Sequence, residues 1–100
     1  TIEEADFTTQ DLIDTLIDDP DWRFRARSAQ LLAEKKEIGV PEALLDAMKN
    51  DENMEVFKHA VRAFKTVTGC IAPDTFEYEY CSEWWEKNSE TVNEKLEMPE

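Results

Sequence analysis

The chain has 100 residues, of which 41% are hydrophobic and 10% aromatic. That is enough apolar material for one core and too much for a disordered chain. Its 24 acidic and 11 basic residues give a net charge of -13, which repels phosphate backbones and anionic lipids, so we expect neither nucleic acid nor a membrane as a partner.

The cellular compartment is predicted from cysteine content and from hydropathy. Cys70 and Cys81 are too few for a disulfide framework, so free thiols are favoured over a bond between them. No run of residues approaches the roughly 18 apolar residues of a membrane-spanning helix. We expect a cytoplasmic protein, although a chain that begins at Thr1 leaves a processed or exported form open.

The first two predicted helices flank an acidic turn at residues 18–21. Thr8 and Asp11 have the spacing of a capping box, which predicts a helix start there. Pro20 suits a first helical position and Asp19 precedes it as a cap, so a second helix is expected over about residues 20–36. Apolar residues follow at helical spacing in both, namely Leu12, Ile13, Leu16 and Ile17, then Trp22, Phe24, Ala29, Leu31 and Leu32.

The next two predicted helices repeat this order. Gly39 and Pro41 predict the start of a third helix, and Asp51 marks a second turn. A fourth helix is expected over about residues 53–68, ending at Gly69, which can adopt the left-handed cap conformation. The apolar residues of the pair are Leu44, Leu45 and Met48, then Val56, Ala60, Phe64 and Val67.

The C-terminal third departs from the helical rhythm. Phe76, Tyr78 and Tyr80 alternate with glutamates, which predicts an extended segment that presses its aromatic rings onto the preceding helices. Ser82 is expected to cap a fifth helix, with residues 98–100 frayed. Neighbouring tryptophans point about 100° apart, so Trp84 and Trp85 should not both face one core. We expect Trp85 to seal the end of the helices. The role of the pair is then either this capping alone or, in addition, an exposed Trp84 anchor for a partner.

Two stretches that begin at Leu12 and Leu44 match in their order of apolar, acidic and small residues at a spacing of 32. In this alignment Asp19 meets Asp51 and Phe24 meets Val56. Periods of 20 to 50 residues are typical of stacked helical repeats. We therefore predict a single all-α domain over residues 1–100. It is an α-α superhelix of two stacked hairpins, at about 9–39 and 40–69, closed by a capping segment and helix at about 70–97.

These residues resemble a HEAT-repeat domain of the short bacterial type also found in bilin lyases. The resemblance covers roughly residues 9–90. It rests on the acidic turn DDPDW, the Phe24-Arg25 pair, Ser28 and Ala29 before Leu32, the VTG ending at Gly69, and the DTFEYEY and EWWEKN segments. It implies that Arg25 reaches the acidic turn and pairs with Asp19 or a neighbour. Phe57 stands where the second repeat should carry an arginine, which breaks a continuous ladder of such pairs.

The sequence contains parts of a phosphate-binding, a calcium-binding and a histidine-based site, but each set of residues is incomplete. On a helix Arg25 points about 200° away from Arg23, so Arg23, Arg25 and Arg27 do not form one phosphate-binding patch. The acids of the first turn lack the glycine and closing glutamate of a calcium loop, and helix capping accounts for them. His59 is the single histidine and has no adjacent ligands or nucleophile. We expect no catalytic residue, metal or cofactor, and structural roles for Arg25, Asp19, Asp51, Gly69 and Trp85.

The predicted function is non-catalytic protein binding, as a small adaptor or regulatory subunit. In helical-repeat stacks the second helices of successive hairpins form the usual binding surface. Here that surface would carry Arg23, Arg27, Gln30, Lys58, His59 and Arg62, with Trp84 as a further contact. A basic partner on the acidic last helix (Glu83, Glu86, Glu90 and Glu94), head-to-tail self-association, and a chromophore-attachment role by analogy with the bilin lyases remain alternatives.

Overall fold

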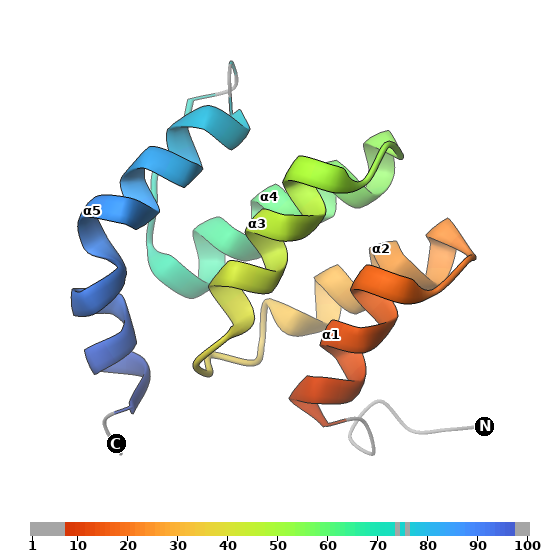
Figure 1. The fold of residues 1–100 in the computed structure, drawn as a ribbon, viewed down its shortest axis with the longest axis horizontal. Coiled ribbons are helices and arrows are strands. Elements are labelled where there is room, and N and C mark those ends of the chain that lie inside the picture. Colours follow the sequence, from red (N-terminus) through yellow and green to blue (C-terminus); the bar gives the residue numbers. More distant parts are fainter. Residues whose placement is uncertain (1–7, 74, 76, 98–100) are drawn as a thin grey trace.

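The computed structural model describes residues 8–73, 75 and 77–97. In these residues the protein is entirely helical, without strands, as the sequence predicts. The helices, shown in Figure 1, are α1 (Thr9–Asp18), α2 (Trp22–Leu32), α3 (Val40–Asn50), α4 (Met54–Thr68) and α5 (Glu77–Glu97).

Helix α1 begins with the predicted capping box. The Thr8 hydroxyl accepts from the Asp11 backbone N–H at 3.1 Å, and the Asp11 carboxylate accepts from the Thr8 N–H at 3.2 Å. Two N–H groups at the start of the helix are thereby satisfied by side chains.

Helix α2 is shorter than predicted at both ends. Asp21, and not Asp19, is its N-cap, because Asp21 Oδ1 accepts from the Arg23 N–H at 2.9 Å. Asp19 instead accepts from the Asp21 N–H at 2.8 Å, which leaves Pro20 inside the turn. At the other end the N–H groups of residues 33–35 bond three residues back, at 2.9 to 3.3 Å. This tighter turn ends the helix at Leu32 and not near residue 36.

The second helical pair follows its local sequence signals closely. Gly39 (φ 94°) caps α3, with Pro41 in the first turn. Asn53 Oδ1 accepts from the N–H groups of Glu55 and Val56 at 2.9 and 3.2 Å, so α4 begins one residue later than predicted. Gly69 (φ 82°) ends α4 in the left-handed conformation, as expected.

Helix α5 replaces the predicted extended segment. It begins at Glu77, so Tyr78 and Tyr80 lie in its first turn and Ser82 is an interior residue and not a cap. Tyr78 is half-buried against the core, whereas Tyr80 is exposed. A helix places Tyr78, Cys81 and Trp85 on one face, and the burial of that face outweighs the two-residue alternation. Phe76 and residues 98–100 lie outside the described residues.

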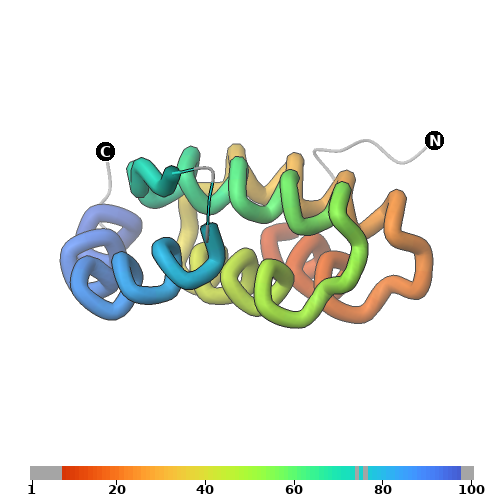
Figure 2. The backbone as a smooth tube through the Cα atoms, turned by 90° about the horizontal axis from the view of Figure 1, so that it is seen from above, coloured from red at the N-terminus to blue at the C-terminus, as the bar shows by residue number. Residues whose placement is uncertain are grey.

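The helices form two layers, with α2 and α4 in one and α1, α3 and α5 in the other (Figure 2). Helices α1 and α2 pack together, as do α3 and α4. Across the pairs α2 contacts α4 and α1 contacts α3, and α5 packs on α3 and α4. The molecule measures 39 × 34 × 17 Å, and its shortest dimension fits two helix layers about 8 to 10 Å apart.

The core runs through both layers and is closed by two tryptophans. Leu16, Leu32 and Phe64 are fully buried in it. Trp84 and Trp85 both meet the Phe64 ring edge-on, at centroid distances of 6.2 and 6.0 Å. The expectation that neighbouring tryptophans cannot face one core is therefore wrong, because two long indole side chains converge on a single ring. Each such contact contributes about 0.5 to 1.5 kcal/mol.

Candidate functional site

Six of the predicted partner-binding residues lie on helices α2 and α4, which run side by side in one layer (Figure 2). All are exposed except His59, which is half-buried. We call the exposed side of these two helices the α2–α4 face, defined by Arg27, Gln30, Lys58, His59 and Arg62.

A hydrogen-bonded group crosses this face between the two helices. Arg27 Nη1 donates to Gln30 Oε1 at 3.0 Å. Gln30 Nε2 lies 3.3 and 3.2 Å from the two ring nitrogens of His59 on α4. Gln30 therefore links α2 to α4 through its contact with the His59 ring.

Arg23 does not join this group. Its guanidinium donates to Asp21 at 2.8 and 3.1 Å, although its side chain is 73% exposed. The hydrogen bond from Arg23 lowers the pKa of Asp21 to about 2. Of the predicted surface residues, Arg23 is thus held at the N-terminal end of α2 by its own turn.

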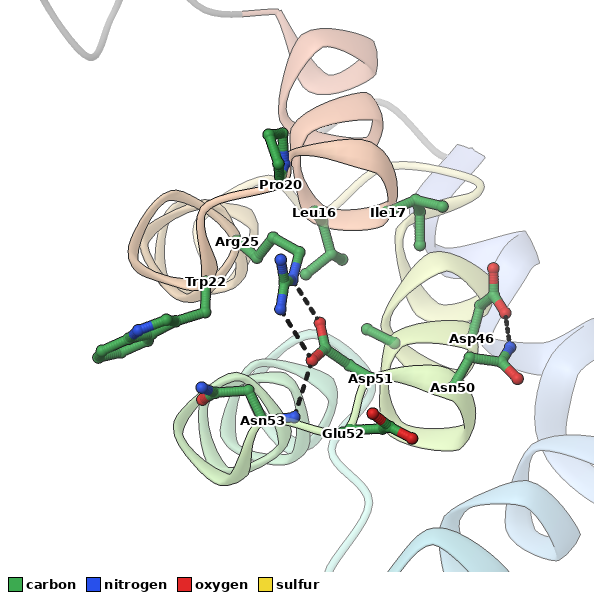
Figure 3. Close-up of a pocket in the computed structure, with 11 residues that line it drawn as sticks. Leu16, Ile17, Pro20, Trp22, Arg25, Asp46, Asn50, Asp51, Glu52 and Asn53 are labelled. Carbon is green, nitrogen blue, oxygen red and sulfur yellow. Dashed lines mark hydrogen bonds and ion pairs between the residues drawn. The ribbon is translucent and has the colours of Figure 1, made fainter.

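Arg25 points into the space between the two turns and is held there by two aspartates (Figure 3). Its guanidinium binds the Asp51 carboxylate through two atoms, with Nε to Oδ2 at 2.7 Å and Nη2 to Oδ1 at 3.3 Å. Nη1 donates to the Asp19 backbone carbonyl at 2.8 Å. Asp51 also accepts from the Asn53 N–H at 3.0 Å. One arginine thus joins the first turn to the second, and its hydrogen bond with Asp51 raises the pKa of Arg25.

The expected Arg25 partner was Asp19 or a neighbour. The structure shows the Asp19 carbonyl in contact, while the carboxylate partner comes from the following turn, 26 residues away. Phe57, which stands where the resemblance expects an arginine, is partly buried against the core.

The sequence did not predict a pocket beside the Arg25–Asp51 pair. This turn pocket has a volume of about 640 Å³ and opens between the two turns. Leu16 and Ala47 are buried residues of its wall, whereas Ile17 and Trp22 are 40% and 42% exposed. The other residues of the wall are Pro20, Arg25, Asp46, Asn50, Asp51, Glu52 and Asn53. The sequence signal that could have indicated this pocket was Trp22, which directly follows the acidic turn. We had assigned Trp22 to the apolar side of α2.

The two cysteines are free thiols and both are buried. Burial is the main cause that raises the pKa of both, that of Cys81 to about 12. Trp84 is half-buried at the α5 contact with Phe64, so its indole is not the freely exposed anchor that we had considered.

The described residues contain neither a metal-ligand cluster nor a helix suited to cross a membrane. No cluster of three or more histidine, cysteine, aspartate or glutamate side chains with ligand geometry occurs there. None of the described helices combines the length and the hydropathy that a membrane span requires.

Comparison with protein-family models, with curated proteins and with solved structures found no match to this chain.

Proposed function

We propose that this protein is a non-catalytic protein-interaction module, a small adaptor or regulatory subunit. In this proposal α1–α2 and α3–α4 are two HEAT-like hairpins stacked as a short α-α superhelix, and α5 is the terminal cap. The observation that carries it is the α2–α4 face, where two helices present exposed cations side by side in a chain of net charge -13.

The chemistry of this face selects its partner. Arg27, Lys58 and Arg62 are exposed, and Gln30 contacts His59 across the two helices. Cations on neighbouring helices attract an acidic surface, while the rest of this acidic protein repels it. The proposed partner is therefore a protein with an acidic or partly apolar face that spans both helices.

Charge reversal on this face tests the proposal. Lys58→Glu combined with Arg62→Glu should abolish partner binding, because two attractive contacts become repulsive, while the helical circular-dichroism signal stays unchanged. The matched control, Lys87→Glu with Lys95→Glu, makes the same charge change on exposed positions of α5 and should leave binding intact.

The readout is affinity capture with the tagged protein, followed by quantitative mass spectrometry across the three forms. A partner lost only with the α2–α4 reversal supports the proposal. Binding that survives this reversal but is lost on reversing Glu86, Glu90 and Glu94 would place the site on α5 and contradict it.

A further inference from the structure

We propose that the turn pocket is a second binding site, which takes a basic segment of a partner protein with an apolar residue beside a lysine or arginine. This site is separate from the α2–α4 face and selects the opposite charge, so it does not rest on the function proposed above.

The turn pocket leaves apolar surface in contact with solvent. Trp22 and Ile17 are each about two-fifths exposed, and Figure 3 shows them on opposite sides of the Arg25–Asp51 pair. The buried residues Leu16 and Ala47 add to this apolar lining. A volume of about 640 Å³ lies within the range of ligand pockets, about 300 to 1,000 Å³. The pocket can thus hold two or three side chains that lie across it.

The wall of the turn pocket carries a net negative charge. The two-atom contact between Arg25 and Asp51 joins opposite charges and cancels both. The remaining charged residues of the wall are Asp46 and Glu52, both exposed and both acidic. The Asn50 amide donates to Asp46, but a neutral amide leaves the negative charge in place. The wall therefore favours a cation and disfavours an acidic peptide.

The apolar and the acidic residues of the pocket wall together fit a basic side chain. Lysine and arginine carry long aliphatic stems that pack on apolar groups while the charge stays near water. Ile17 offers such a surface on the same side of the pocket as Asp46 in Figure 3. Trp22, on the other side, can accept an apolar residue or a second cation against its ring. A small metal ion would use the carboxylates alone, whereas a basic segment uses the whole pocket.

The test uses a fluorescein-labelled peptide, Gly-Ser-Leu-Arg-Leu-Lys-Ser-Gly, and the full chain. Fluorescence anisotropy at low salt measures affinity, and amide chemical shifts locate the peptide. We expect saturable binding, with the largest shifts in residues 16–22 and 46–53. Asp46→Asn with Glu52→Gln should weaken binding by about fivefold, the loss of two exposed ionic contacts. Trp22→Ala should weaken it as well, while Lys58→Glu with Arg62→Glu should not.

The matched control is Glu86→Gln with Glu90→Gln on α5, which changes the net charge by the same two units and should leave the affinity within about twofold. Equal weakening by both double variants would show general attraction to an acidic protein and would overturn the proposal. So would shifts concentrated on α5 or on the α2–α4 face, or equal affinity for the acidic peptide Gly-Ser-Leu-Glu-Leu-Glu-Ser-Gly.

Discussion

Replacing Arg25 with alanine tests how strongly the two turns are held together. The substitution removes three hydrogen bonds, at 2.7, 3.3 and 2.8 Å. It also leaves the Asp51 carboxylate, whose side chain is only 9% exposed, without its cationic partner, although the Asn53 N–H still donates to it. Hydrogen bonds to charged groups contribute about 1.5 to 3 kcal/mol, and stranding a buried charge costs more. We expect a loss of about 2 to 4 kcal/mol in the free energy of unfolding.

The matched variant is Arg23→Ala, two residues earlier on the same helix. The Arg23 side chain is 73% exposed and its ion pair with Asp21 lies at the surface, so the expected loss is a small fraction of that for Arg25→Ala. Arg25→Lys keeps the charge but cannot bind Asp51 through two atoms, and should fall between the two. Urea unfolding followed by circular dichroism measures the differences. For a domain of this size 2 to 4 kcal/mol corresponds to a fall in Tm of roughly 10 to 20 °C. Equal effects of Arg25→Ala and Arg23→Ala would refute the assigned role of Arg25.

Three further outcomes are expected. Deleting residues 74–100 removes α5 and exposes the core surface that α5 covers, so cooperative thermal unfolding should be lost or the protein should aggregate. A soluble truncated protein with an unchanged melting curve would contradict this. By NMR, the pKa of Asp21 should be about 2 in the wild type and should rise toward about 4 in Arg23→Ala. Because the folded pKa of Asp21 is lowered, its contribution to stability should be lost as pH falls from about 4 through 2. A wild-type midpoint near 4 would show that the ion pair does not form in solution. Cys70 and Cys81 should react slowly with iodoacetamide at pH 8, because burial raises the pKa of both thiols. Because the folded pKa of Cys81 is raised to about 12, the free energy of unfolding should fall as pH rises above about 9. Alkylation of the native protein as fast as that in urea would show that the thiols are not buried.

Helix ends with a local chemical signal could be predicted from the sequence. The Thr8–Asp11 capping box and the left-handed Gly69 depend on residues within one turn of the helix, and both are found. The start of α5 could not be found in this way. The alternation of Phe76, Tyr78 and Tyr80 predicts an extended segment. The helix is favoured instead by the burial of Cys81 and Trp85, and this burial depends on the packing of α5 on α3 and α4.

The site shows the same division between local and long-range information. Helical geometry alone separates Arg25 from Arg23, and the structure places their guanidinium groups in different surroundings. The sequence could not choose the carboxylate partner of Arg25, because Asp51 comes near only when the second turn lies beside the first. The turn pocket depends on the same juxtaposition, so neither Trp22 nor Asp46 stood out as part of a site.

The two ends of the helical layers are closed to different degrees. Val56 on α4 is fully buried, whereas Phe24, its counterpart 32 residues earlier on α2, is 58% exposed. The difference follows from position: among the described helices α4 has α2 on one side and α5 on the other, while α2 contacts α1 and α4 and has no helix beyond it. At the α4 end Trp84 and Trp85 converge on Phe64 and complete the core. A similar apolar position is therefore a core residue in the second helical pair and a surface residue in the first.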